Sequence, residues 1–307
     1  MTSIFSPVSL ERRADYYACW ARTPVHSLDY TLANLWGWQE YYGLEWRFDA
    51  GLCWLRQTRP LPVCWAPLGD WNAFDWQAMG WAEWQGMFTG SGVDAGDELV
   101  FLRVPEELAG LWRRAMPERL DVAEDRGQWE YLYNWEELAF LPGNRFHRKK
   151  NHFNAYIKAY GEDYHRLDDS MIEDVLALQD NWCQWHECDD SPSLKAENEA
   201  INRVLSHWDH FQGLCGGALY AQGQMVAFSV GERLDGQNLG VHYEKGLNGF
   251  RGVYQAMNRF FAQYAGADFT LINRAQDMDE DGLRQAKMSY LPMDFLRKYK
   301  VRLRKSS

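Results

Sequence analysis

The stretch most informative about the fold runs Val241-His-Tyr-Glu-Lys-Gly-Leu-Asn-Gly-Phe-Arg-Gly252. A strand pattern over residues 238–244 passes through three glycines directly into a helical pattern that begins at Val253. Glycines allow a ligand to approach the backbone, and the first N–H groups of a helix attract anions. The stretch therefore predicts either an ordinary strand-to-helix loop or a phosphate cradle, which would be formed by Gly249, Arg251, Gly252 and Val253.

Helical and strand patterns alternate on both sides of this stretch. Residues 214–220 and 225–233 flank Gln222-Gly-Gln224 and predict a hairpin, and Ser170-x-x-Glu173 is typical of a capping box that opens a helix. Further patterns predict strands over 44–49, 52–57, 99–104, 120–123, 129–133, 269–272 and 295–301, and helices over 71–88, 105–114, 153–160, 253–264 and 281–290. This mixture indicates an α/β or α+β class.

The chain divides by composition into two halves of unequal charge. Residues 1–144 carry 21 Asp and Glu against 11 Arg and no Lys, a net charge of −10, and hold 13 of the 16 Trp. Residues 145–307 carry 22 acidic against 21 basic residues, a net charge of −1, with all nine Lys. We therefore expect two domains, 1–144 and 145–307, with a linker helix over 145–160. A localised basic site is expected only in the second.

The overall composition excludes several classes of protein. The net charge of −11 argues against a protein that coats polyanions. The apolar runs are too short to span a membrane, and the N-terminus lacks the pattern of a secretory signal. The six Cys lack framework spacing, which predicts reduced thiols in a cytoplasmic protein.

Glu244 is the first candidate for chemistry. A carboxylate at a strand end, next to an anion-binding loop, could act as a general base or anchor an ammonium group. The alternative is a surface Glu that pairs with Lys245. Downstream, Arg284 and Lys287 share a helix face and could hold a phosphate or carboxylate, although such a pair is more often solvated.

Two clusters resemble metal sites only weakly. Asp277, Asp279 and Asp281 match the first half of a calcium loop, but its final position is Met288 instead of Glu. Cys183, His186 and Cys188 lack the second ligand pair of a zinc motif. We expect no metal at either cluster, and we interpret Thr89-Gly-Ser91-Gly92 as a plain loop.

The basic run Arg145-Phe-His-Arg-Lys-Lys-Asn-His152 is a local excess of positive charge in an acidic chain. It could receive a phosphate-bearing cofactor, the acceptor end of an RNA or an anionic lipid headgroup. Equally, it could be a solvated linker helix.

Taken in order, several blocks resemble the phosphatidylglycerol lysyltransferase C-terminal-like family, in its stand-alone soluble bacterial form. The most specific match is Tyr131-Leu-Tyr-Asn-Trp-Glu-Glu-Leu-Ala-Phe-Leu-Pro-Gly143, running into His147-Arg-Lys-Lys-Asn-His-Phe-Asn154. It is accompanied by Tyr30–Trp38, Met225–Glu232, His242–Lys245, Ile272–Arg274 and Gly282–Pro292.

The resemblance implies two tandem GNAT-like domains, each a mixed, mostly antiparallel sheet flanked by helices. Family members of known chemistry move an aminoacyl group from a charged tRNA to a lipid or peptidoglycan acceptor, whereas ordinary GNAT enzymes use acyl-CoA. On this analogy, loop 246–252 is the donor-binding turn. His242, Glu244, Asn273 and Arg274 would line a cleft.

We therefore expect an acyl- or aminoacyltransferase that acts on an amine or hydroxyl acceptor, with no tightly bound cofactor. Glu244 would be base or ammonium anchor and Tyr290 an acid toward the leaving group. Substrate binding would involve His242, Asn273, Arg274, Arg284, Lys287, Arg148 and Lys149. The alternatives are a non-catalytic binding protein that keeps the fold, and an enzyme that docks on anionic membranes through residues 145–152 and 298–305.

Overall fold

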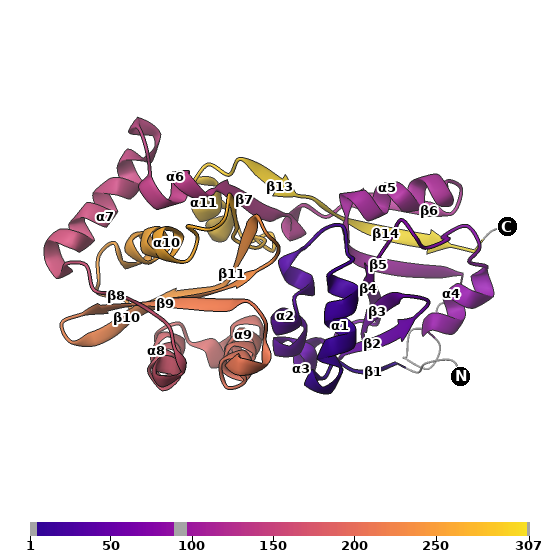
Figure 1. Ribbon diagram of the computed structural model, residues 1–307, viewed down its shortest axis with the longest axis horizontal. Helices are drawn as coiled ribbons and strands as arrows, with labels where there is room; N and C mark the ends of the chain where they lie inside the picture. The colour runs from indigo at the N-terminus through magenta and orange to yellow at the C-terminus, as the bar shows by residue number, and fades with distance from the viewer. Residues whose placement is uncertain (1–4, 89–96, 306–307) are drawn as a thin grey trace. The chain divides into compact units, whose positions relative to one another are not determined.

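The computed structural model describes residues 5–88 and 97–305, which fold as two compact units (Figure 1). The first unit contains residues 1–129, 276–279 and 296–307, and the second contains residues 130–275 and 280–295. The division therefore falls after Trp129, whereas the sequence placed it after Asn144. The reason is strand pairing: β7 (Glu130–Asn134) joins the second sheet beside β12 (Leu271–Asn273).

The first unit is built on one mixed sheet in the order β1-β2-β3-β4-β5-β14-β6. Its strands are β1 (Ser6–Pro7), β2 (Leu44–Asp49), β3 (Leu52–Gln57), β4 (Val63–Gly69), β5 (Glu98–Pro105), β6 (Leu120–Glu124) and β14 (Lys298–Arg304). Its helices are α1 (Arg13–Trp20), α2 (Leu32–Gly37), α3 (Gln39–Tyr42), α4 (Trp81–Phe88) and α5 (Glu106–Ala115). All described pairings are antiparallel except that of β4 with β5.

Tryptophan side chains dominate the core of this unit. Among the described residues, six of them are at most 1% exposed, namely Trp46, Trp54, Trp65, Trp71, Trp84 and Trp112. Edge-to-face contacts connect Trp54 with Trp84 and Trp84 with Trp112, at centroid distances of 5.9 and 6.2 Å. Aromatic pairs in this geometry stabilise a core beyond the burial of their surface area. The high Trp content of the first half therefore serves packing.

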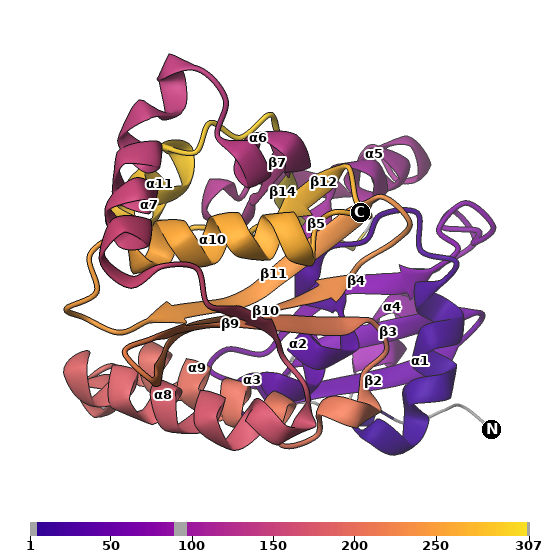
Figure 2. The ribbon, with the colours of Figure 1, turned by 60° about the vertical axis from the view of Figure 1, so that its left-hand side comes forward.

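The second unit has a sheet of the same kind, in the order β13-β7-β12-β11-β10-β9-β8. The strands not yet given are β8 (Tyr164–Arg166), β9 (Leu214–Ala221), β10 (Gln224–Arg233), β11 (Asn238–Gly246) and β13 (Asp294–Leu296). Its helices are α6 (Trp135–Phe140), α7 (His147–Tyr160), α8 (Ile172–Trp185), α9 (Pro192–Leu205), α10 (Val253–Tyr264) and α11 (Asp281–Met288). Helix α10 covers one face of the central strands, and α8 and α9 cover the other (Figure 2). The predicted mixed, mostly antiparallel sheets with flanking helices are confirmed.

Strands β11 and β12 of the second sheet pair in parallel over only a short segment. Strand β11 pairs with β12 only over Asn238–Gly240, opposite Leu271–Asn273. Strand β11 then continues to Gly246, and β12 ends at Asn273. Consequently, Glu244 and Arg274 both lie beyond the end of the paired segment, where side chains can meet without an intervening strand.

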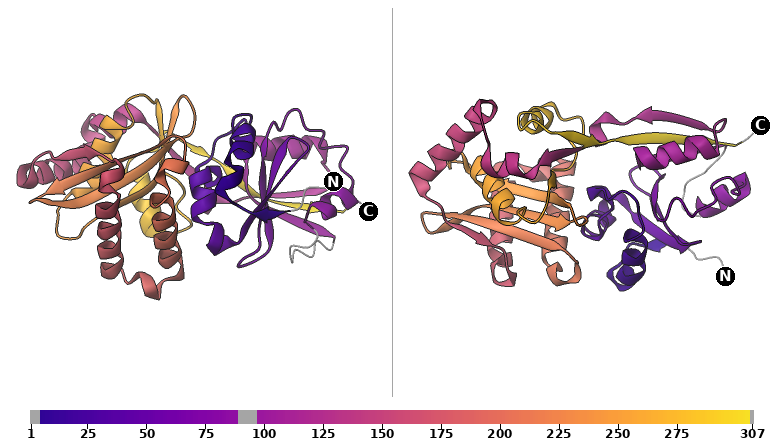
Figure 3. Two further views of the ribbon diagram at one scale, coloured as in Figure 1. Left: turned by 60° about the horizontal axis from the view of Figure 1, so that its bottom comes forward. Right: turned by 45° about the horizontal axis from the view of Figure 1, so that its top comes forward.

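The C-terminal strand differs most from the prediction. The expected strand 295–301 is instead β13 followed by β14, and β14 lies between β5 and β6 in the first sheet (Figure 3). Lys298 is fully buried. Residues 298–304 therefore form an internal strand of the first sheet and not a tail, and docking of 298–305 on a membrane stays a prediction.

Two local predictions fail because side chains hold the backbone in turns. Over 71–80 the chain is not helical, since the Asp70 and Asp75 carboxylates accept backbone N–H groups two and three residues ahead. The helix begins only at Trp81. The capping box at Ser170 also fails, because Asp168 accepts hydrogen bonds from both the Ser170 N–H and its hydroxyl. Asx turns such as those at Asp70 and Asp75 compete with helical structure, whereas Asp168 caps the 3₁₀ turn Asp169–Met171 that leads into α8.

The cysteines are not all reduced. Cys183, in the last turn of α8, is bonded to Cys188, with a Cα–Cα distance of 5.1 Å. The chain turns back directly after the helix, which brings two residues only five apart within bonding distance. The other four cysteines are thiols. The expectation that Thr89–Gly92 is a plain loop concerns residues outside the described ones.

Candidate functional site

The glycine loop is shaped first by packing. Gly252 caps α10 with a φ of +85°, and a Cβ there would lie 2.2 Å from the His152 carbonyl oxygen of α7. Gly249 has a φ of +93° but open space around it. Residues 247–255 line a shallow cavity of about 340 Å³, with Arg251 exposed and Val253 buried. The loop can accommodate a ligand, but Gly252 is explained by the contact between helices.

Glu244 is the centre of a buried polar cluster. Its Oε1 accepts a hydrogen bond of 3.1 Å from Nη2 of Arg274, and the side chains are 11% and 14% exposed. The amide of Asn258, on α10, lies 3.5 Å from Glu244 Oε2. Burial alone would lower the pKa of Arg274, but Glu244, Tyr133 and Tyr290 together outweigh it and raise that pKa. Glu244 is therefore paired inside the protein and is not the surface partner of Lys245.

Two buried oxygens beside Glu244 have no hydrogen-bond partner. Ser229 pairs directly with Glu244 across β10 and β11, so the two side chains are neighbours on one face of the sheet. The Ser229 Oγ and the Asn258 Oδ1 are both buried, and neither makes a hydrogen bond within the described part of the chain. Buried polar atoms are usually paired with protein, water or ligand groups, so these two oxygens are open to a donor from outside the protein.

Tyr290 and Lys149 extend the cluster toward α7. The Tyr290 side chain is buried, and its hydroxyl makes a hydrogen bond with Gln255 in the first turn of α10. The Lys149 Nζ lies 4.0 Å from the centroid of the Tyr290 ring, and the Arg274 Cζ lies 5.2 Å from it. Burial raises the pKa of Tyr290, so its hydroxyl stays protonated at neutral pH and can donate.

His242 does not join Glu244. The pairing of β10 with β11 shifts between Val230 and Gly231, which leaves His242 as the extra residue of a bulge. Its Nε2 lies 2.8 Å from Glu232 Oε2, and both side chains are almost fully buried. The bulge changes the alternation of side chains between His242 and Glu244, and the two have different partners.

Other predicted site residues have structural partners. The Asn273 amide donates to Glu130 at 2.5 Å, and the Lys287 ammonium donates to the Arg274 carbonyl oxygen at 2.7 Å. Lys287 is thus turned inward, while Arg284 is only partly buried. Arg148 is exposed on α7. Lys287 positions the backbone of Arg274 and is not part of a solvated phosphate grip.

The adjacent Lys245 belongs to the opposite face of the sheet. Its Nζ donates to Glu197 of α9 at 2.7 Å and lies 3.9 Å from the ring centroid of Trp182 on α8. Consecutive residues of β11 therefore take part in two separate ion pairs, Glu244 with Arg274 and Lys245 with Glu197. This arrangement supplies a matched control for experiments on Glu244.

The side chains of both weak metal clusters have other partners in the structure. Both sulfurs of the first form the disulfide, and His186 stacks on Trp182 at a centroid distance of 4.0 Å. In the second, the buried Asp277 carboxylate pairs with Arg126 at 3.3 Å and accepts the Asp279 N–H. Among residues 5–88 and 97–305, no group of three His, Cys, Asp or Glu side chains is arranged to hold a metal.

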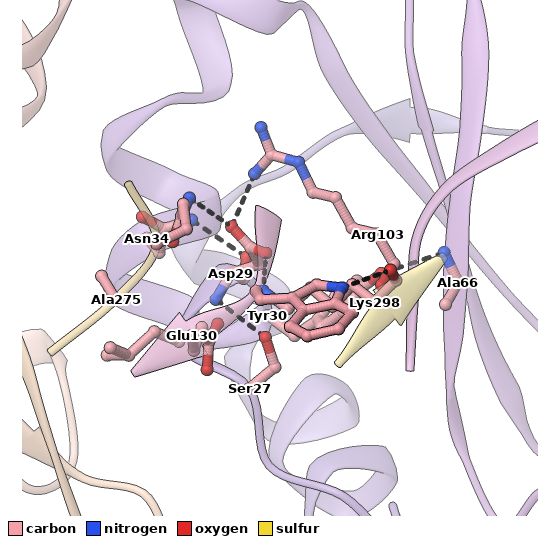
Figure 4. A network of polar contacts seen from close by, with 12 residues as sticks. Ser27, Asp29, Tyr30, Asn34, Ala66, Arg103, Glu130, Ala275 and Lys298 are labelled. Atoms are coloured by element: carbon pink, nitrogen blue, oxygen red, sulfur yellow. Dashed lines mark hydrogen bonds and ion pairs between the residues drawn. The ribbon is translucent and has the colours of Figure 1, made fainter. Parts of the chain in front are cut away.

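The first unit holds a second buried ionic network (Figure 4). Asp29 accepts a hydrogen bond of 2.7 Å from Arg103 and another from the fully buried Lys298. Burial would raise the pKa of Asp29, but Arg103 and Lys298 outweigh it and hold that pKa below its usual value. Tyr30 receives the Ala66 N–H and donates to the Arg103 carbonyl. Since its carboxylate is fully engaged, we assign this network to stability.

The family model described as "Phosphatidylglycerol lysyltransferase, C-terminal" matches residues 20–302. The chain belongs to this family. A protein of unknown function from Bacteroides thetaiotaomicron has a similar structure, with a TM-score of 0.86 and 26% identity over 99% of this chain and 100% of that one. The C-terminal domain of a putative lysylphosphatidylglycerol synthetase from Agrobacterium fabrum has a TM-score of 0.64 and 12% identity over 95% and 90%.

Two further matches bear on the fold and on the extent of the chain. A tandem GNAT protein from the clavulanic acid biosynthesis pathway shares the fold, with a TM-score of 0.51 and 9% identity over 99% of both chains. An uncharacterized protein from Mycoplasmoides gallisepticum is 25% identical over 174 residues, 56% of either chain, so the match spans about half of that relative. The family model therefore shows the family of the chain, and the tandem GNAT protein shows its fold. No helix of the described residues is long and apolar enough to cross a membrane.

Sequence reasoning missed Ser229, Asn258 and Gln255. Asn258 lies three residues before Phe261, which the helical pattern places on the buried face of α10. Ser229 is a lone hydroxyl in the otherwise apolar segment 225–230. A polar residue on a face predicted to be buried is the signal that could have indicated both.

Proposed function

We propose that the second unit transfers an aminoacyl group from a donor ester to an amine or hydroxyl acceptor. The supporting observation is the set of three acceptors formed by Glu244, the Ser229 Oγ and the Asn258 Oδ1. A primary ammonium has three N–H donors and one positive charge. It would satisfy both unpartnered oxygens and bind the carboxylate. A simple acyl group from acyl-CoA would leave them unsatisfied.

In this proposal Glu244 is the ammonium anchor. Arg274 donates to its carboxylate and the Asn258 amide lies 3.5 Å from it, so the carboxylate is held in place to meet a bound cation. Arg274 has further N–H donors, and its charge would stabilise the negative oxygen that forms when the acceptor attacks the ester carbonyl.

The reaction balances with Tyr290 as the proton donor. The acceptor nitrogen or oxygen forms a bond to the carbonyl carbon, and the bond between that carbon and the donor oxygen breaks. The Tyr290 hydroxyl gives its proton to the leaving oxygen and regains one from the acceptor. The raised pKa of Tyr290 brings it closer to that of an alcohol leaving group, which favours transfer between similar acids.

The proposal also covers the donor, the acceptor end of its tRNA and contact with an anionic membrane. The donor is an aminoacyl-tRNA, whose acceptor end would reach the exposed Arg148 on α7, and acyl-CoA is the alternative donor. Both donors are made in the cytoplasm, where we place the protein. Contact of the run 145–152 with an anionic membrane stays a prediction, which co-sedimentation with anionic vesicles at low and high salt would test.

The test is a transfer assay with the full chain. Wild type, Glu244→Gln and Glu197→Gln are incubated with tRNA carrying radiolabelled amino acids, or with labelled acetyl-CoA. The acceptors supplied are anionic phospholipid vesicles, peptidoglycan peptides and small amines. We expect a labelled product from tRNA that Glu244→Gln abolishes and Glu197→Gln retains.

Two other outcomes would contradict this proposal. Product formed from acetyl-CoA and unaffected by Glu244→Gln would remove the role of the ammonium pocket. Binding of an amino acid amide with no transfer from either donor would favour the alternative, a ligand-binding protein that retains the fold.

A further inference from the structure

Lys149, in the first turn of α7, is a half-buried ammonium without a counter-ion. It contacts the face of the Tyr290 ring, 4.0 Å from the centroid, and makes no ion pair with any residue in 5–88 or 97–305. Burial and then the nearby Arg274 lower the pKa of Lys149. A charged group removed from water without a partner is unfavourable, so the position suits a site that a ligand completes.

The charges around Tyr290 are unbalanced. Arg274 and Lys149 both lie close to its ring, and Glu244 is the acid that interacts with Arg274. These three side chains carry a net charge of +1. The second unit as a whole contains 15 Lys and Arg against 23 Asp and Glu, a net charge of −8. A local positive excess within an acidic unit indicates an anionic ligand at that place.

We propose that Lys149 and Arg274 form a subsite for a phosphate group of the substrate, beside the ammonium pocket of Glu244. The inference rests on the proposed function, because it assigns the phosphate to the molecule whose ammonium or acceptor group binds next to it. Ammonium and guanidinium groups together bind phosphate oxygens through charge-assisted hydrogen bonds. The phosphate can come from a nucleotide donor or from a phosphorylated acceptor.

Calorimetric titration of the full chain with three small probes separates these sources. Adenosine 5′-monophosphate represents a nucleotide donor, sn-glycerol 3-phosphate represents a phosphorylated acceptor, and L-alaninamide tests the ammonium pocket. The variants are Lys149→Gln and, as the control, Lys150→Gln, because within the described residues it is Lys149 whose ammonium contacts the Tyr290 ring.

Lys149→Gln is expected to weaken binding of the preferred phosphate ester about tenfold, because it removes one charge-assisted hydrogen bond. Lys150→Gln should change it less than about twofold, the scale of a screened surface charge. Neither variant should alter alaninamide binding. Tighter binding of the nucleotide assigns the phosphate to the donor, and tighter binding of the glycerol ester assigns it to the acceptor.

Equal phosphate affinity in wild type and Lys149→Gln would overturn the subsite, as would no binding of either ester by wild type. Phosphate binding without alaninamide binding would instead contradict the ammonium pocket and leave the subsite intact. If Lys149→Gln fails to fold, the wild-type phosphate affinity is measured from about pH 7 to about pH 10. It should fall as Lys149 loses its proton below its ordinary pKa, and a flat profile would contradict the subsite.

Discussion

Replacing Glu244 with Gln is expected to abolish ammonium binding by the second unit while the unit stays folded. The substitution keeps the size of the side chain and one acceptor oxygen, so the hydrogen bond from Arg274, now 3.1 Å, can persist. It removes the negative charge that both Arg274 and the bound ammonium need. The two effects, on stability and on binding, have different magnitudes and can be measured separately.

The stability effect follows from the replacement of a charge-assisted hydrogen bond by a neutral one. Such bonds contribute about 1.5–3 kcal/mol and about 0.5–1.5 kcal/mol respectively, so the free energy of unfolding should fall by about 1–2 kcal/mol. Because the Glu244 and Arg274 side chains are 11% and 14% exposed, solvent screening reduces this only slightly. In a unit of this size the melting temperature would fall by roughly 2–8 °C.

The substitution is expected to change the free energy of ammonium binding by a larger fraction than the free energy of unfolding. Loss of about 1.4 kcal/mol or more lowers the affinity for L-alaninamide at least about tenfold, as measured by titration calorimetry. The control is Glu197→Gln, which breaks the 2.7 Å ion pair of Lys245 on the opposite face. It should lower the melting temperature comparably and leave the affinity unchanged. Unchanged affinity in Glu244→Gln, or an equal loss in both variants, would refute the ammonium pocket.

Two further predictions concern the folded state. Gly252→Ala should destabilise the protein by about 2 kcal/mol or more, because its φ is +85° and the new Cβ would lie 2.2 Å from the His152 carbonyl oxygen. Gly249→Ala has a strained φ but open space for the Cβ, so it should cost about 1–2 kcal/mol. Denaturant titration measures both losses of stability and distinguishes them. Asp29→Asn should destabilise the first unit by about 3–5 kcal/mol at neutral pH, since it leaves Arg103 and Lys298 without their carboxylate. Asp29 has a lowered pKa in the folded state, so its stabilisation is complete above the unfolded value of about 3.9 and is lost as the pH falls through the lower folded value. Trp fluorescence, which comes mainly from the 12 of 16 Trp in the first unit, should therefore show wild type and variant converging in strong acid.

Local patterns predicted the elements whose signals lie within a few residues. The hairpin of β9 and β10 was predicted from Gln222-Gly223-Gln224, and the structure has a left-handed conformation at Gln222 and Gly223. Asn134 caps α6 by accepting the Glu137 N–H, as Asn commonly does at a helix N-terminus. The failures at 71–80 and at Ser170 share one cause. The carboxylates of Asp70, Asp75 and Asp168 accept hydrogen bonds from nearby backbone N–H groups. The residue type alone does not show whether an Asp caps a helix or holds a turn.

The candidate site could be predicted only in part, because its members meet through long-range pairing. Glu244 and Arg274 were expected on sequence grounds, and the structure places them 3.1 Å apart. Ser229 joins them through the register of β10 against β11, and that register contains a bulge at His242 that strand periodicity does not show. The same bulge separates His242 from the cluster it was expected to join.

The two structural units differ in charge from the two halves divided at residue 144. Division at residue 144 made the second half nearly neutral, and a localised basic site was therefore expected only there. The C-terminal strand β14 carries basic residues into the first sheet, so the first unit has 17 Lys and Arg against 20 Asp and Glu, a net charge of −3, and the second has −8. The unit that holds the Glu244 cluster is therefore the more acidic one. Its overall field would repel a polyanion, so an anionic donor must be held by short-range contacts that salt screens little, such as those of Lys149 and Arg274 beside Tyr290. Substituting these two side chains should consequently affect donor binding far more than neutralising acidic residues at a distance.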